Sequence, residues 1–174
     1  RPDIDYVYRI TGGSSILHDH ELTYSLVCSE NDLDLKCSVK ESYRMLCKFL
    51  IEFYRKLGLW AEFAIKSKAK ELGKYGNFCF SNWQHYDILI RGRKIGGNAQ
   101  RRRKSIIFQH GSIPVSINYS LLESVIKVED SYRSKSASLE DLLGFKQDFF
   151  ALSRDLVKSF QTLFGIQFLQ ETLT

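Results

Sequence analysis

The sequence predicts a single domain of mixed α+β or α/β class. About six short segments have the β-branched and aromatic content of strands, whereas three or four others have helical character. The 174 residues suffice for one sizeable hydrophobic core. Hydrophobic residues make up 44% of the chain and charged residues 26%, a globular rather than a disordered composition. Residues 1–174 are therefore treated as one domain.

The amino-terminal half is expected to contain one long helix between short strands. Ser38 and Glu41 form a capping-box pattern, and the apolar stripe that follows at i, i+3 and i+4 spacing predicts a helix to about Leu57. Gly58 suits the position just after the helix end. Strands are expected at residues 6–10, 22–28 and 60–64, and an exposed lysine-rich connector at 66–74.

The carboxy-terminal half is expected to begin with short strands and to end with a helix. The apolar stripe over residues 146–163 predicts an amphipathic helix that Gly165 ends, and Ser138 opens a shorter helix that ends at Gly144. Further strands are expected at 86–90, 94–95, 105–109, 113–117 and 166–169, a hairpin turn at 91–92, a helical turn at 121–126 and a polar loop at 131–138.

Two glycine pairs lie beside residues that can take part in chemistry. Gly12-Gly13 comes shortly before His18-Asp19, and paired glycines permit a close approach of the backbone to a ligand, although a plain hairpin turn explains such a pair equally well. Lys94 precedes Gly96-Gly97, where a lysine can reach a bound carboxyl, thioester or phosphate. The alternative is a surface lysine on a bulged strand, and the spacing does not decide.

Cys79 lies in an aromatic loop, Phe78-Cys79-Phe80, just before a predicted strand. A thiol is nucleophilic as its thiolate, which nearby cations such as Arg93 and Lys94 would favour. The residues alone favour an inert buried thiol. The four cysteines form no CxxC pair and no Cys/His cluster with zinc spacing, so the sequence predicts no metal site and reduced thiols.

The run Arg101-Arg102-Arg103-Lys104 is the strongest local charge, and the whole chain carries a net charge of +5. Such a run indicates a solvated face or a docking patch for an acidic partner. Nucleic-acid binding is the competing explanation, because aromatic residues that could stack on bases lie nearby. His18 and His110 each lie in a predicted loop beside a strand, where a histidine is a general base, a ligand contact or a structural residue.

Three stretches together resemble the lipoate-protein ligase and octanoyltransferase superfamily. The first motif, residues 9–19 (RITGGSSILHD), resembles its R-x-[ST]-G-G-x-x-V-x-H-D signature. The second motif, residues 92–100 (GRKIGGNAQ), resembles G-[RK]-K-[IV]-x-G-[SN]-A. The third motif, residues 109–113 (QHGSI), resembles the H-G-[ST] element that follows. The resemblance implies the biotin/lipoate protein ligase catalytic domain, with a central, mostly antiparallel sheet flanked by helices.

The resemblance also implies a set of site residues. Cys79 and Lys94 would be catalytic, the first as nucleophile and the second as the group that orients the acyl carbonyl. Substrate would be bound by residues of the three motifs, namely Arg9, Thr11, Gly12, Gly13, Ser14, Ser15, His18, Asp19, Gly96, Gly97, Asn98, Ala99, Gln100, His110, Gly111 and Ser112.

Two chemistries compete within this superfamily. Adenylating ligases usually have a third glycine in the first motif, followed by H-D-x-G-N, whereas this chain has Ser14 and continues as Glu21-Leu22-Thr23-Tyr24-Ser25. That continuation, with Cys79-Phe80, resembles the cysteine-dependent octanoyltransferases. The expected enzyme is therefore an acyltransferase that needs no cofactor. The alternatives are an ATP-dependent lipoate-protein ligase, which would use ATP and Mg²⁺, and a non-catalytic or nucleic-acid-binding module.

The octanoyltransferase hypothesis specifies the partners and the cellular location. An octanoyl or lipoyl group would move through a Cys79 thioester from an acidic acyl carrier protein to a lysine of a lipoyl-carrier protein, either a lipoyl domain or a glycine cleavage H protein. A cytoplasmic protein without a membrane partner is expected. Because the sequence starts at Arg1, close to the first motif, we also expect the family's amino-terminal strand and helix to be missing.

Overall fold

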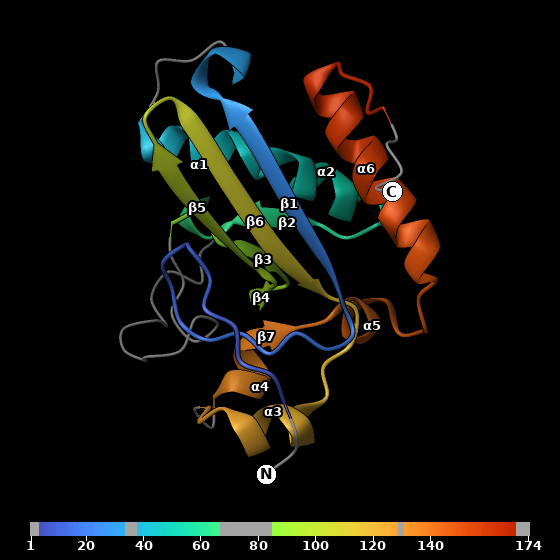
Figure 1. Cartoon of the computed structure of the whole chain (residues 1–174). Helices are drawn as coiled ribbons and strands as arrows, with labels where there is room; N and C mark the ends of the chain where they lie inside the picture. The colour runs from blue at the N-terminus through green and yellow to red at the C-terminus, as the bar shows by residue number, and fades with distance from the viewer. Residues whose placement is uncertain (1–3, 34–37, 67–84, 129–130, 170–174) are drawn as a thin grey trace.

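The computed structural model describes residues 4–33, 38–66, 85–128 and 131–169 (Figure 1). Within these ranges the chain forms two β-sheets, six α-helices and two short 3-10 helices. The elements in chain order are β1 (Glu21–Ser29), η1 (Glu30–Leu33), α1 (Val39–Leu46), α2 (Lys48–Lys56), β2 (Ala61–Phe63), η2 (Ala64–Lys66), β3 (Ile88–Ile90), β4 (Arg93–Ile95), β5 (Gly97–Arg103), β6 (Ile106–Pro114), α3 (Tyr119–Val125), α4 (Tyr132–Lys135), β7 (Ser136–Ala137), α5 (Leu139–Leu143) and α6 (Phe149–Phe164).

The first sheet is antiparallel, in the order β1–β6–β5, and helices cover one of its faces. Alternate residues of β1 face the helices, so that Leu22 is buried while Thr23 and Val27 are exposed. Helices α1, α2 and α6 lie on the covered face, and Phe49 of α2 packs edge-on against Tyr24 with ring centroids 5.2 Å apart (Figure 1). In the described part of the chain no helix covers the opposite face, which the segment before β1 crosses instead.

The second sheet has the order β2–β3–β4–β7, with one parallel pair, β4–β7, among antiparallel ones. Its central strand, Ile88–Ile90, is a continuous apolar run that is buried on both faces. The two sheets share one hydrophobic core with α2, α5 and α6, whereas Leu122 of α3 and Tyr132 of α4 form a second, smaller cluster. The prediction of a mixed fold with a mostly antiparallel sheet and flanking helices is confirmed.

The helix ends follow the predicted signals, but one helix is divided. Ser38 and Glu41 cap α1 reciprocally, with the Glu41 carboxylate accepting from the Ser38 backbone N–H at 2.9 Å. The prediction of a single helix as far as Leu57 is wrong, because the helix breaks at Cys47 into α1 and α2. There the Leu50 N–H bonds the Cys47 carbonyl at 3.2 Å, which is a tighter, three-residue turn that apolar spacing does not reveal.

Two predicted strands are absent from the described residues. Residues 6–10 and 166–169 are irregular, and the side chains of Tyr6, Val7 and Tyr8 are largely exposed. Aromatic and β-branched residues favour a strand only where a neighbouring strand pairs with them, and neither segment pairs with one here.

Two other predicted boundaries are also wrong. The strands expected at 105–109 and 113–117 are the single strand β6, because its partner β1 runs alongside without a break and keeps residues 110–112 extended. The loop expected at 131–138 contains α4 and β7, which forms because two residues pair with β4. The connector expected at 66–74 falls outside the described residues, except for Lys66 at the end of η2.

Candidate functional site

The buried centre of the second motif is Lys94. Its ammonium lies 2.7 Å from the Asp87 carboxylate, and the two side chains are only 3% and 7% exposed. The turn Arg91-Gly92, with both residues at positive φ, folds β4 back on β3 so that Lys94 pairs with Leu89. An ammonium and a carboxylate are tolerated at this depth because each neutralises the other. Asp87 was not among the predicted site residues, although a lone carboxylate opening an apolar strand is a usable signal.

Gly96 is the point where the second motif passes from one sheet to the other. It is the only residue between β4 of the second sheet and β5 of the first, and its φ is 70°. A Cβ atom there would lie 2.2 Å from the Ser112 carbonyl oxygen. Glycine is therefore required both for the backbone angle and for the approach to β6. Lys94 thus lies two residues before the point where the chain meets the third motif.

The second and third motifs lie side by side as paired strands. Gly97 is opposite Ser112, Asn98 is opposite Gly111, and Ala99 is opposite His110 in the β5–β6 ladder. The two motifs thus form one surface of the first sheet. His110 was expected in a loop and no strand was expected over residues 97–103, because glycine, serine and charged residues are common in loops.

The first motif crosses this surface as a loop and contacts the third. The buried Thr11 hydroxyl lies 2.6 Å from His110 Nε2, and the Arg101 guanidinium donates to the Ile10 carbonyl at 2.7 Å. Arg9 donates to the Ser14 carbonyl at 2.5 Å, which closes the loop around Gly12-Gly13. Gly12, Gly13 and Ser15 are exposed, and Gly13 has a φ of 110°. The backbone of this glycine pair is therefore open to a ligand.

His110 is held toward its neutral form. Partial burial lowers its pKa, and the charges of Arg9 and His18 lower it further. Its ring stacks on Phe108, with centroids 5.3 Å apart. A neutral imidazole in this position can donate or accept a hydrogen bond without adding charge to the site.

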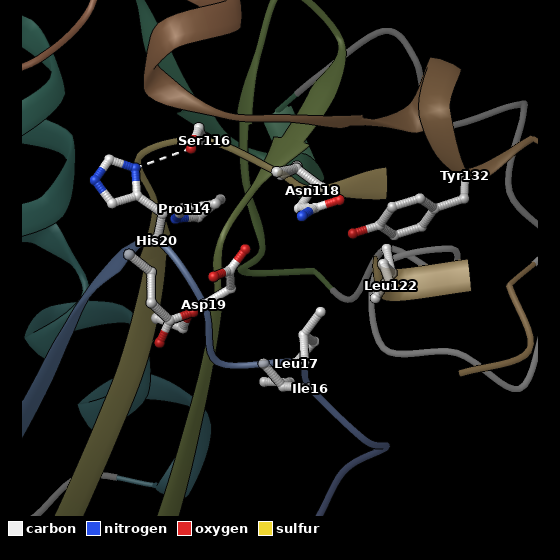
Figure 2. A pocket seen from close by; sticks show the side chains of 12 residues that line it. Ile16, Leu17, Asp19, His20, Pro114, Ser116, Asn118, Leu122 and Tyr132 are labelled. Carbon is white, nitrogen blue, oxygen red and sulfur yellow. Dashed lines mark hydrogen bonds between the residues drawn. The ribbon is translucent and has the colours of Figure 1, made fainter. Parts of the chain in front are cut away.

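The first and third motifs are also joined through Glu21, which was not among the predicted site residues. Its carboxylate accepts hydrogen bonds from His18 Nδ1, from the Thr23 hydroxyl and from the Ser112 hydroxyl. A small pocket of about 40 Å³ opens beside it, with Asp19 and Ser112 also in its wall. Figure 2 shows this pocket, with the His20–Ser116 hydrogen bond at one side and the Tyr132 hydroxyl pointing toward Asn118.

Asn98 and Gln100 bond to side chains on the helix-covered face of the first sheet. The Tyr24 hydroxyl donates to Asn98 Oδ1 at 2.7 Å, and Gln100 donates to Gln109 at 3.0 Å. The Ser42 hydroxyl of α1 donates to Gln100 at 2.9 Å. This network connects β5 to β1, β6 and α1 on the helix-covered face. A direct substrate contact by Asn98 or Gln100 stays a prediction.

The predicted nucleophile, Cys79, lies outside the described residues, as does the rest of its loop. Of the other cysteines, Cys47 is fully buried, and that burial raises its pKa far above the usual value for a thiol. Cys28 is half-buried, and its pKa is also raised, mainly by burial. Neither has the lowered pKa of an activated thiol.

The described residues contain no group of three or more His, Cys, Asp or Glu side chains arranged to hold a metal ion. No helix within the same ranges combines the length and the apolar character needed to cross a bilayer.

Two solved structures share this fold. The structure of a lipoate-protein ligase A bound with ATP aligns with a TM-score of 0.75 and 24% identity, covering 95% of this chain and 61% of that one. A bipartite lipoate protein ligase studied with its E2 lipoyl domain, from Thermoplasma acidophilum, aligns with a TM-score of 0.70, 24% identity and the corresponding coverages of 95% and 60%. At this identity the likeness establishes the fold.

The sequence comparisons agree with the fold. An octanoyltransferase LipM of Oceanobacillus iheyensis is 33% identical over 177 residues, which cover 97% of this chain and 64% of that relative. The chain thus spans less than two thirds of the relative's length. Residues 1–161 match the family described as the lipoyl protein ligase A/B catalytic domain. With all three motifs present and the fold shared, the chain belongs to the lipoyl protein ligase A/B catalytic domain family.

Proposed function

We propose that this chain carries the catalytic machinery of a cysteine-dependent octanoyltransferase. The observation that carries the proposal is the buried Lys94–Asp87 pair, fixed by Gly96 against the third motif. It places a fixed cation beside a surface made by all three motifs, in a chain that resembles an octanoyltransferase along 97% of its length. An ammonium so placed suits an acyl carbonyl, whose oxygen gains negative charge during transfer.

The proposed reaction is a two-step acyl transfer. The Cys79 thiolate attacks the thioester carbonyl of an octanoyl-carrier protein, forming a new S–C bond and releasing the carrier's thiolate. The amine of a lysine on the acceptor then attacks acyl-Cys79, forms the amide and expels the cysteine thiolate, while the amine loses a proton to solvent or to a base. Lys94 and the open backbone around Gly12-Gly13 stabilise the oxyanion in both steps.

The acceptor in this proposal is a lipoyl-carrier protein, either a lipoyl domain or a glycine cleavage H protein. The donor is an acyl carrier protein. Support for the acceptor comes from the family itself and from the structural relative studied with its E2 lipoyl domain. Both kinds of carrier are typically acidic, which matches the net charge of +5 on this chain.

The carriers are proposed to dock on the β5–β6 hairpin. Arg102 pairs with Glu30 at 2.7 Å and Arg101 bonds the first motif, so both serve contacts within the chain. Arg103 and Lys104 are exposed at the hairpin tip. Changing both to glutamate is expected to raise the KM for a carrier-bound donor about 10-fold, with less effect at high salt, and to leave a small acyl thioester unaffected. Lys56→Glu, an exposed change on α2, is the matched control.

The central test is acylation of Cys79. Mass measurement of the intact protein mixed with octanoyl-carrier protein, in the absence of ATP, is expected to show one octanoyl adduct that hydroxylamine removes. Cys79→Ala is expected to abolish the adduct, whereas Cys28→Ala keeps it. Unimpaired transfer by Cys79→Ala would rule out the cysteine mechanism. An absolute need for ATP with free acid, together with pyrophosphate release, would establish the adenylating ligase instead.

A further inference from the structure

Glu21 is a buried carboxylate that the proposed chemical steps do not use. Its side chain is 7% exposed and accepts hydrogen bonds from three different side chains. His18 Nδ1 donates at 2.5 Å and the Thr23 hydroxyl at 2.6 Å, both to one oxygen, while the Ser112 hydroxyl donates to the other. A carboxylate removed from water needs such donors, because a charge without them is costly to bury.

The three donors come from different parts of the fold. His18 is the last residue but one of the first motif, Thr23 lies in β1, and Ser112 lies in the third motif on β6. In the β1–β6 ladder Thr23 is opposite Ser112, so the strands bring two donors to the same place. The third donor, His18, belongs to the loop, and its side chain is 60% exposed. Glu21 therefore ties a solvent-exposed loop to the rigid sheet.

Ser112 makes this tie relevant to the rest of the site. The Ser112 carbonyl lies against Gly96, where β4 passes into β5, and Ser112 is opposite Gly97 in the β5–β6 ladder. A side chain that bonds both His18 and Ser112 thus fixes the first motif relative to the crossover that carries Lys94. At the other side of the loop, Thr11 bonds His110. The first motif is therefore anchored to β6 at both ends.

We propose that Glu21 is a positioning residue, which acts through His18 and Ser112 to hold the first-motif loop in register with Lys94. The role in catalysis rests on the acyl-transfer function proposed above. The loop anchoring itself does not. A glycine, which the adenylating pattern H-D-x-G-N has at this place, has no side chain to make the bridge.

The test combines loop order with chemistry. Hydrogen exchange of residues 11–19 is measured on the substrate-free chain for wild type, Glu21→Ala, Glu21→Gly and Glu21→Gln. The same proteins are then mixed with octanoyl-carrier protein, and the rate of Cys79 acylation is followed against donor concentration. Amide hydrogen exchange in the loop is expected to be faster in the alanine and glycine variants than in wild type. Their limiting rates of Cys79 acylation at high donor concentration are expected to fall about 10- to 100-fold.

Glu21→Gln is the conservative variant, because an amide of the same shape still accepts from His18 and Thr23 and can bond the Ser112 hydroxyl. It is expected to show the same hydrogen exchange in the loop as wild type, and an acylation rate within about threefold of the wild-type rate. Glu52→Ala, which removes a surface carboxylate paired with Arg55 on α2, is the control and should change neither readout. Should Glu21→Ala fail to fold, Thr23→Val removes one exposed donor, and faster loop exchange is expected from it too.

Each outcome decides a different point. Unchanged loop exchange in the alanine and glycine variants would overturn the anchoring role. Faster loop exchange with an unchanged acylation rate would overturn the positioning role in catalysis. If wild type forms no acyl-Cys79 at all, the proposed function fails, and the exchange data still decide whether Glu21 holds the loop.

Discussion

The hydroxyl of Tyr24 donates a 2.7 Å hydrogen bond to Asn98 Oδ1, and the two side chains close directly over Gly111. These residues lie on the three neighbouring strands of the first sheet, in one row across the ladder. The bond therefore spans β6 from β1 to β5. It requires that the residue beneath it have no side chain.

Gly111→Ala is expected to destabilise the protein by about 1–3 kcal/mol through overpacking. The added Cβ would lie 2.1 Å from Asn98 Oδ1 and 2.5 Å from the Tyr24 ring, so the bond must break or the strands must shift. Urea unfolding followed by fluorescence measures the change. Gly12→Ala, where nothing lies within 4 Å, is the control, and its effect should be below about 0.5 kcal/mol.

Gly96→Ala is expected to cost clearly more stability than Gly92→Ala. Both glycines have φ near 70°, so each substitution bears a left-handed backbone penalty of about 1–2 kcal/mol. Only at Gly96 would the new Cβ also meet backbone, 2.2 Å from the Ser112 carbonyl oxygen, whereas the space around Gly92 is open. Equal losses in thermal or urea unfolding would show that the crossover at Gly96 and β6 are not in close contact.

Breaking the Lys94–Asp87 pair is expected to destabilise the fold by about 3–5 kcal/mol for either Asp87→Asn or Lys94→Met. Each single change removes the ion pair between these two groups and leaves the other charge buried. The double variant should recover much of the loss, because neither charge is then buried. A double-mutant cycle of unfolding free energies measures the coupling. Additive losses would mean that the two groups do not interact.

His110 is expected to titrate below the ordinary histidine value of 6.5, and Arg9→Gln should raise its pKa by removing a nearby cation. Since the folded-state pKa lies below the unfolded one, the unfolded chain binds the proton more readily. Stability contributed by neutral His110 is therefore present above pH 6.5 and is lost as the pH falls through that value toward the folded pKa. NMR titration of the histidines, together with unfolding of His110→Gln against pH, tests both statements. A midpoint above 6.5 would contradict them.

Cys47 is expected to resist iodoacetamide in the folded protein and to react after unfolding. It is fully buried, its pKa is raised by that burial, and its sulfur accepts a hydrogen bond from Gln109. Peptide mapping after labelling at pH 8 measures the modification. Cys28, which is half-buried, provides the internal comparison and should react earlier.

The sequence predicted the parts of the fold whose signals are local. The capping box at Ser38, the glycine after α6 and the turn at Arg91-Gly92 all act through neighbouring residues, and all are found. Residues 6–10 were wrongly assigned to a strand because pairing is not a local property. The continuity of β6 was missed for the same reason, since its extension through residues 110–112 depends on β1.

The three motifs around the candidate site could be recognised from the sequence. Thr11 bonds His110 and Ser112 bonds Glu21, although the resemblance, and not their spacing, placed these motifs together. Asp87, Glu21 and Tyr24 were missed because each lies in or at the edge of a predicted strand, where apolar periodicity does not identify a residue that bonds across the fold. Long-range hydrogen bonds leave no periodic trace in a sequence. Single carboxylates beside a motif are the signal worth following.

The bond between Glu21 and Ser112 joins residues 91 positions apart, and the one between Thr11 and His110 joins residues 99 apart. A chain that emerges from the ribosome amino end first presents β1 long before its partner β6 has been made. The loop before β1 therefore lacks its bonds to His110 and Ser112 until most of the domain has been synthesised. Pairing of such distant strands makes folding slow, because loop closure precedes any compensating contact. The most solvent-exposed part of the site is thus among the last to acquire its shape.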